Sequence, residues 1–231
     1  MRFPDARVLR VDRDSANTPK KWQLLLDTIH NGGADILIGT QMLAKGHDFP
    51  RLTLVGVVGA DAALFAADFR APERLFSQLM QVGGRSGRAA LAGEVLIQTE
   101  HPTHPLYRAL IAHDYRRFAE MQLAERRSAG FPPFSHQALL SAEAKQLDCA
   151  LDFLGLAAAA AREVLPEGIS LYDPVPMRLY RVMALERGQL LVESASRPAL
   201  QGFLAAWMDR LYRLKPPRDL RWRIDVDPLE F

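Results

Sequence analysis

QLMQVGGRSGR, at residues 78–88, is the stretch from which the rest of the chain can be interpreted. An apolar run of helical character at residues 76–82 leads into two glycines and then into Arg85 and Arg88. Because glycine accepts backbone torsions that other residues resist, a turn here can present both guanidinium groups on one side. Two guanidinium groups three residues apart can clamp a transferring phosphoryl group, as an arginine finger does. The competing interpretation is a solvated basic turn between a helix and the strand at residues 94–99.

Short apolar runs alternate with helical patterns around this stretch. Such alternation is typical of an open α/β sheet with parallel strands, whose ligands bind at the carboxyl ends of the strands. We therefore expect the first part of the chain to be α/β. The predicted strands are residues 7–12, 35–39, 52–58 and 94–99, and a helix at 18–27 has Thr18 as its cap and Pro19 in its first turn.

The pattern changes after a long amphipathic helix that we predict at residues 106–127. The sequence GFPPF at residues 130–134 interrupts that helix, and we place a domain boundary there, between residues 1–129 and 130–231. The second part reads β-α-β-β-α-β, the order of a ferredoxin-like α+β fold. Its predicted strands are residues 137–143, 168–172, 189–193 and 220–226, and its predicted helices are residues 146–165 and 198–214.

Composition sets the broad class of the protein. The chain has 231 residues, 48% of them hydrophobic and 24% charged, as in globular proteins of one large or two ordinary domains. We find no apolar run of the roughly 20 residues that span a bilayer and no signal-peptide core at the start, so we expect a cytoplasmic location and no membrane partner. The single Cys149 excludes an internal disulfide framework and a cysteine-rich zinc site. The 24 arginines against 5 lysines suit phosphate recognition and follow equally from a GC-rich genome.

A second informative stretch, GTQMLAKGHDFP at residues 39–50, follows a strand of the buried type. It should therefore lie at the ligand-binding edge of the sheet. Thr40 and Gln41 offer hydrogen-bonding side chains suited to a nucleic-acid phosphate, and Lys45 adds a cation beside the flexible Gly46. Asp48 can accept hydrogen bonds from a sugar hydroxyl. A superficially metal-like pair, HPTHP at residues 101–105, is predicted as a turn because of its two prolines.

A basic segment lies near the end of the chain, at residues 210–223. It reads RLYRLKPPRDLRWR and holds six cations against one acid. With Tyr212 and Trp222 between cations such as Arg213 and Arg221, it could seat a nucleic-acid backbone and stack on a base. The alternative is a solvated helix end followed by an edge strand.

GTQMLAKGHDFP followed by DFRAPERLFSQLMQVGGRSGR resembles the second motor lobe of superfamily 2 DNA helicases, and among them the PriA family. The resemblance continues through AERRSAGFPPFS to the terminal DVDPLEF, so it extends over essentially the whole chain. It implies a RecA-like motor lobe at residues 1–129 and a small DNA-binding domain at 130–231. The implied parent protein is an ATP-dependent 3′→5′ DNA helicase that acts in replication restart and primosome assembly at stalled forks.

The resemblance also assigns roles to particular positions. By resemblance, Arg88 is the arginine finger, Arg85 supports the γ-phosphate, and Gln81 belongs to the same nucleotide-facing motif. Gly46 and Asp48 match positions that approach the nucleotide, and Thr40 and Gln41 match positions that contact the DNA strand. Asp61 and the sequence at 68–70 match the stretch that links the two sites. The implied partners are forked or single-stranded DNA, primosome proteins and single-strand-binding protein.

Several features of the family are missing from this sequence. It has no Gly-Lys and no Asp-Glu dipeptide, so the phosphate-binding loop and the acidic metal-binding motif are absent. The zinc-binding cysteines and the N-terminal DNA-binding domain are also absent, and Gly59 stands where many relatives have an Asp. We therefore expect the C-terminal third of such a helicase, inactive as an ATPase alone. ATP and Mg²⁺ would be shared with the missing first lobe, and zinc would occur only in the full-length protein.

Two other interpretations remain open at this point. The chain could be a non-catalytic DNA- and primosome-binding module derived from a helicase, because an arginine finger does nothing without a partner lobe. It could also come from another superfamily 2 enzyme, such as a fork-remodelling or repair helicase. That last alternative predicts a different kind of domain after Gly130.

Overall fold

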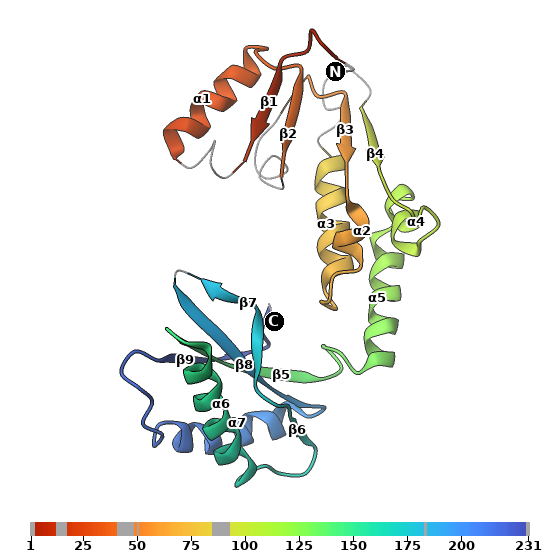
Figure 1. Cartoon of the computed structure of the whole chain (residues 1–231). Coiled ribbons are helices and arrows are strands. Elements are labelled where there is room, and N and C mark those ends of the chain that lie inside the picture. Colours follow the sequence, from red (N-terminus) through yellow and green to blue (C-terminus); the bar gives the residue numbers. More distant parts are fainter. Residues whose placement is uncertain are drawn as a thin grey trace. The chain divides into compact units, whose positions relative to one another are not determined.

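The computed structural model of the chain describes residues 3–12, 18–40, 49, 51–84, 93–182 and 184–229. The chain divides into two compact units, Met1–Glu120 and Met121–Phe231 (Figure 1). Both mix helices with strands, so the predicted α/β character is confirmed, with parallel pairs in the first unit and antiparallel pairs in the second. The predicted domain boundary after residue 129 stays a prediction. No helix in the described ranges is both long and apolar enough to cross a membrane.

Where the structure describes the first unit, it has four short strands that pair in parallel, as the apolar runs predict. Within the described residues they form two separate two-stranded sheets, where we had expected one open sheet. The first sheet pairs β1 (Val8–Val11) with β2 (Ile36–Gly39), and the second pairs β3 (Leu54–Val57) with β4 (Glu94–Ile97).

Five helices begin in the described part of the first unit. The predicted cap of the first helix is confirmed, because the Thr18 hydroxyl accepts a hydrogen bond from the Lys21 N–H at 3.3 Å and proline follows Thr18 directly. The core of the unit forms where helices pack on the β3–β4 pair, with Leu75, Phe76 and Phe118 nearly inaccessible. The helices are α1 (Pro19–His30), α2 (Ala60–Leu64), α3 (Ala71–Gly83), α4 (Pro105–Ile111) and α5 (Tyr115–Ala129).

The prediction of one long helix at residues 106–127 is wrong, because the chain there forms α4 and α5 in turn. His113 has a φ of 52°, a left-handed conformation that a continuous helix cannot contain. The Asp114 carboxylate then accepts a hydrogen bond from the Arg117 N–H at 2.9 Å, which restarts the helix. The predicted end of the helix at Gly130 is confirmed: Gly130 has a φ of 69°, and the Phe131 N–H donates to the Arg126 carbonyl at 2.8 Å.

The second unit is an antiparallel sheet in the order β6-β8-β5-β9, with β7 paired to β8. All predicted strands and helices of this part are present, and β7 is an additional strand that the sequence pattern did not reveal. Its pairing with β8 shifts register between Pro176 and Arg181. The elements are β5 (His136–Ala144), α6 (Leu147–Arg162), β6 (Ile169–Leu171), β7 (Val175–Val182), β8 (Leu185–Ser194), α7 (Arg197–Leu211) and β9 (Arg221–Val226).

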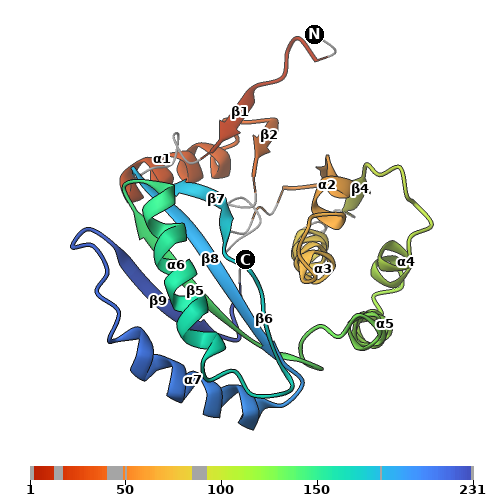
Figure 2. The same cartoon turned by 60° about the horizontal axis from the view of Figure 1, so that its bottom comes forward.

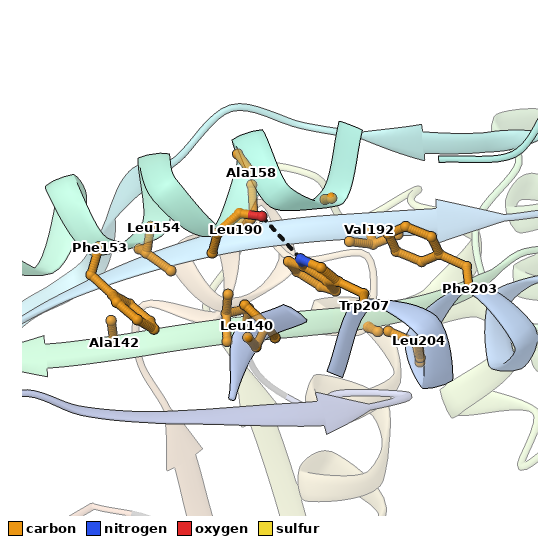
Figure 3. Packing of buried hydrophobic residues seen from close by; sticks show 14 of the residues in the cluster. Leu140, Ala142, Phe153, Leu154, Ala158, Leu190, Val192, Phe203, Leu204 and Trp207 are labelled. Atoms are coloured by element: carbon orange, nitrogen blue, oxygen red, sulfur yellow. Dashed lines mark hydrogen bonds between the residues drawn. The ribbon is translucent and has the colours of Figure 1, made fainter. Parts of the chain in front are cut away.

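Helices α6 and α7 cover one face of this sheet (Figure 2). Alternate residues of β5, among them Leu140 and Ala142, point at the helices, as the period of two in a strand requires. Trp207 of α7 is fully buried at the centre, and its indole N–H donates a hydrogen bond to the Ala157 carbonyl of α6 (Figure 3). The alanine-rich face of α6 allows this close approach. This sheet and its two helices hold the basic segment of residues 210–223 in place.

Candidate nucleotide and nucleic-acid interface

Helix α3 carries the chain toward the two predicted phosphate-binding arginines. Its first turn is held by Asp68, whose carboxylate accepts a hydrogen bond from the Arg70 N–H at 2.8 Å and pairs with the Arg74 guanidinium at 2.7 Å. Further along, the ring of Phe76 stacks on that of Phe118 with centroids 4.1 Å apart. Both contacts fix the helix on the core of the first unit, so whatever follows α3 begins from a defined position.

Gln81 lies on the last turn of α3 and is exposed. The helix ends where the Gly84 N–H donates to the Met80 carbonyl at 3.0 Å. Arg85 and Arg88 follow directly in sequence, but they lie outside the described residues. The structure therefore places the beginning of the predicted nucleotide-facing motif, and the roles of the two arginines stay predictions.

The predicted DNA-contacting loop begins at the carboxyl end of β2. Thr40, immediately after that strand, is exposed. At the other end of the loop Phe49 is 6% exposed, and its carbonyl accepts a hydrogen bond from the Leu52 N–H at 2.9 Å. The intervening candidates, Gln41, Lys45, Gly46 and Asp48, lie outside the described residues. Their roles stay predictions.

Asp61 joins two parts of the first unit near the ends of β3 and β4. Its carboxylate accepts hydrogen bonds from the Thr99 hydroxyl and from the Glu100 N–H, the latter at 2.8 Å. The bond from Thr99, followed by that from Glu100, lowers the pKa of the Asp61 carboxyl. Gly59, just before α2, has a φ of 73°, a conformation that glycine adopts without strain. Asp61 therefore works here as a brace between α2 and the segment after β4.

The two histidines at 101 and 104 lie in a turn, as predicted. The His104 N–H donates to the His101 carbonyl at 3.0 Å, and the Nδ1 atom of His104 accepts from the Leu106 N–H at 3.2 Å at the start of α4. The ring of His101 meets that of Phe65 edge-on, with centroids 4.9 Å apart. The side chain of His104 thus serves as a helix cap.

In the second unit, strand β9 separates residues that the sequence had grouped together. Trp222 lies opposite Ala142 on the face covered by the helices, packs against the core and stacks on Phe153 with centroids 6.1 Å apart. Arg221 and Arg223 alternate with it and therefore lie on the other face. Arg223 Nε donates to the Ser141 hydroxyl at 3.3 Å. Trp222 and Arg221 thus cannot form one compact patch, although both lie on an edge strand.

The end of α7 presents a second part of the basic segment. Arg213 follows the helix and is exposed, as is Tyr212. Sequence reasoning missed that Asp219, the single acid of the segment, pairs with Lys145 at 2.6 Å. This pairing lowers the pKa of Asp219 and raises the pKa of Lys145. Because Lys145 neutralises that acid, the segment presents its cations with little internal compensation.

A cavity of about 450 Å³ lies beside this ion pair, at the beginning of α6. It was not predicted, because its walls come from parts of the chain about 70 residues apart in sequence. Its lining residues are Ala144, Lys145, Gln146, Cys149, Pro217, Arg218, Asp219 and Leu220. Cys149 is a free, half-buried thiol.

Residues 127–229 match the family model described as the primosomal protein N C-terminal domain. The Replication restart protein PriA of Haemophilus influenzae is 42% identical over 98% of this chain and 31% of its own length. PriA proteins of Synechocystis sp. and Bacillus subtilis are 37% and 33% identical, each over 98% of this chain and over 27% and 28% of their own lengths. The chain belongs to the PriA family. It corresponds to the C-terminal part of PriA and spans about a third of the length of these relatives.

The PriA match also decides one open alternative. Another superfamily 2 helicase would carry a different kind of domain after Gly130, whereas residues 127–229 match the PriA C-terminal domain. Among solved structures, the de novo designed protein Foldit4 covers 41% of this chain and 97% of its own, with a TM-score of 0.31 and 0% identity. That likeness is too weak to bear on the fold.

Proposed function

We propose that this chain supplies the second motor lobe and the C-terminal DNA-binding module of an ATP-dependent 3′→5′ DNA helicase in replication restart. The observation that carries the proposal is the match to PriA, which extends over 98% of the chain and so includes both units and the motif from Gln81 to Arg88. A role in primosome assembly at stalled forks follows from the same likeness. Forked or single-stranded DNA, primosome proteins and single-strand-binding protein are the proposed partners.

The proposal includes a finer assignment of both folds. The first unit would be a RecA-like lobe, which is supported by its parallel strand pairs and by the helices packed on one face of β3 and β4. The second unit would be ferredoxin-like. In support, α6 follows β5, α7 connects β8 to β9, and the order β6-β8-β5-β9 places the first and third strands of a β-α-β-β-α-β unit side by side. Strand β7 is then an addition to that unit.

In this proposal the chain contributes only part of an ATPase site. Arg88 would stabilise the transition-state charge on the γ-phosphate, and Arg85 would support the same phosphate. Gln81 fits a nucleotide-facing role because it is exposed on the last turn of a well-anchored helix. ATP, when bound, supplies the phosphoryl group and the energy of the cycle. The phosphate cradle and the Mg²⁺ ligands would come from the first lobe, since this sequence has no Gly-Lys and no Asp-Glu dipeptide.

The DNA would contact both units. Thr40 starts a loop at the carboxyl end of β2, the edge where α/β sheets bind ligands, and the following Gln41 and Lys45 suit a phosphate backbone. Gly46 and Asp48 would carry that loop toward the nucleotide and so link the two sites. In the second unit, Arg213 and Arg221 would contact phosphates from the two sides of the β9 edge.

DNA-stimulated ATP hydrolysis tests the proposal. This chain alone should bind forked DNA without turning over ATP, because it lacks a phosphate cradle. In a longer PriA protein that contains this chain, Arg88→Ala should abolish hydrolysis and spare DNA binding, whereas Arg108→Ala, an exposed residue of α4, should leave both intact. Turnover by this chain alone that Arg88→Ala removes would mean that the half-site account is wrong. Full turnover by the longer Arg88→Ala protein would exclude Arg88 as the finger and favour a non-catalytic DNA-binding module.

A further inference from the structure

Three aromatic rings from three elements of the second unit form a row. Phe153 of α6 is buried, with 3% of its surface exposed, and its ring stacks on that of Trp222 in β9. The ring of Trp222 in turn lies 5.6 Å from that of Tyr212, which follows α7, with 57° between the ring planes. Tyr212 is 72% exposed. The row therefore runs from the core to the surface and ends in one largely exposed ring.

The packing decides which of these rings is available to a ligand. Trp222 packs against the core on one side and has Tyr212 near it, so it supports Tyr212 and has little face left for a ligand. Tyr212 is fixed at its backbone, because its N–H donates to the Met208 carbonyl at 3.0 Å. An exposed aromatic ring on a fixed backbone loses little conformational entropy when a planar ligand stacks on it.

The charge around Tyr212 is positive. The segment 210–223 holds Arg210, Arg213, Lys215, Arg218, Arg221 and Arg223. Arg210 pairs with Glu163 at 3.0 Å, and the acid Asp219 is taken up by Lys145. Asp209, exposed one turn before Arg213, is a further acid near the ring. The exposed cations Arg213, Lys215 and Arg218, which follow Tyr212, outnumber this acid, so an approaching ligand would be anionic as well as planar.

We infer that Tyr212 is a stacking platform for an unpaired base of single-stranded DNA, with the phosphates beside that base held by the exposed cations that follow it, Arg213, Lys215 and Arg218. This inference rests on the proposed function of the second unit as a DNA-binding module. It assigns the stacking role to Tyr212, which the sequence had shared with Trp222. A base has the planar face and its strand the negative charge that the site selects, and aromatic stacking next to a cationic track is how sequence-tolerant single-strand binding works.

A protein partner is a poorer fit to the same surface. Stable protein interfaces bury about 800 Å² on each partner around an apolar core. Here one exposed ring stands among cations, and the neighbouring aromatic rings face inward. Such a surface offers stacking and charge but little apolar area.

The test compares two oligonucleotides of equal length, oligo-dT and an abasic strand with the same phosphates and no bases. Their affinities for the full 231-residue chain are measured by fluorescence anisotropy over a range of salt concentrations. The wild-type chain should prefer oligo-dT, and Tyr212→Ala should weaken oligo-dT binding about 5- to 150-fold, the range for one stacked base. Binding to the abasic strand and the salt slope of both strands should not change. Tyr212→Phe should keep the preference, and Tyr172→Ala, at a half-exposed tyrosine after β6, is the matched control.

The outcomes separate this inference from the proposed function. Failure of the wild-type chain to bind either strand would remove the DNA-binding role itself. Strong wild-type binding that Tyr212→Ala leaves unchanged would overturn the stacking role alone, and would favour a protein partner for this ring. An equal loss on oligo-dT and on the abasic strand would also overturn it, because the effect would then come from charge or folding. Selective loss on oligo-dT, restored by Tyr212→Phe, is the expected result.

Discussion

Trp207 Nε1 donates a hydrogen bond to the carbonyl oxygen of Ala157 at 2.9 Å, and the bond is buried between helices α6 and α7. Trp207 has no exposed surface, and its ring lies among Leu140, Leu190 and Val192 of the sheet (Figure 3). One side chain thus fixes the distance between α6 and α7 and fills the space that both helices share with the sheet. Arg213, one of the predicted DNA-binding residues, follows the end of α7.

The first prediction concerns this contact. Trp207→Phe should destabilise the chain by about 1–3 kcal/mol, because it removes a buried hydrogen bond and leaves a smaller ring in the same space. Trp207→Ala should cost about 3–5 kcal/mol, since it opens a large cavity. Urea unfolding followed by circular dichroism measures both. As a control, Leu156→Ala, at an exposed position of α6, should keep a free energy of unfolding within about 0.5 kcal/mol of the wild type. A Trp207→Phe variant as stable as this control would contradict the role of the hydrogen bond.

The second prediction is a pH dependence in the first unit. Arg7 donates three hydrogen bonds to the Asp35 carboxylate. They come from its backbone N–H at 2.9 Å, from Nε at 2.9 Å and from Nη2 at 2.7 Å. These bonds lower the pKa of Asp35 well below its usual range. Since the carboxylate is favoured in the folded state, its contribution to stability is present above the unfolded-state pKa of about 3.9 and is lost as the pH falls below it.

Asp35→Asn should therefore lower the urea midpoint of unfolding at pH 7. The gap, meaning the difference in midpoint between wild type and variant, should shrink below about pH 4. The pair is exposed, so added salt should narrow the gap as well. Unfolding in urea at pH 7, 5 and 3, followed by circular dichroism, measures the difference between the two midpoints. A gap of the same size at every pH would mean that the ionised carboxylate of Asp35 is not what matters.

The third prediction concerns the break between α4 and α5. The Asp114 side chain accepts from the Arg117 N–H at 2.9 Å and caps the start of α5. Asp114→Ala should cost about 0.5–2 kcal/mol, the usual loss for a helix cap, whereas Asp114→Asn should retain most of the stability. Thermal unfolding by circular dichroism checks both variants. Equal stability of the Ala and Asn variants would show that the capping bond contributes nothing.

These contacts also explain what the sequence could predict. The cap at Thr18 and the end of α5 at Gly130 depend on neighbours in sequence, so their residue types were sufficient. The sequence did not predict the break at His113, because the apolar spacing of α4 and α5 continues through it. A positive φ at a histidine also cannot be recognised from the residue type. The face occupied by Trp222 depends on its register opposite Ala142, a partner about 80 residues away, which no local pattern reveals.

Candidate site residues divide in the same way. Residue type and spacing were enough to select Gln81 and Thr40, and the structure places both at exposed ends of regular elements. The neutralisation of Asp219 by Lys145 joins two residues 74 positions apart, so composition alone understated the positive charge of the basic segment. The sequence was therefore sufficient to identify the cations, whereas the pairing of Asp219 with Lys145 is visible only in the tertiary structure.

The last prediction uses the placement of Arg213 and Arg221. Arg213 follows α7, whereas Arg221 lies on β9 on the face away from the helices, and no contact joins them among the described residues. If each contacts a different phosphate, Arg213→Glu and Arg221→Glu should each weaken binding to forked DNA. Each should also reduce the slope of log K against log salt by about 1. The double variant should show the sum, because sites without a shared partner act additively.

Anisotropy titrations at several salt concentrations measure these slopes, and Arg108→Glu in α4 of the first unit is the matched charge reversal outside the basic segment. An effect of Arg213→Glu alone would confine the DNA to the helix-covered side of the sheet, next to Tyr212. An effect of Arg221→Glu alone would move it to the opposite face. If Arg213→Glu and Arg221→Glu lose no more DNA affinity than Arg108→Glu, their effect comes from the net charge of the chain and not from contacts with phosphates. Each of these charge reversals changes the net charge by the same amount. Additive losses well beyond that control require DNA at the β9 edge, within reach of Arg221 on one face of the strand and of Arg213 after α7, the helix that covers the other face.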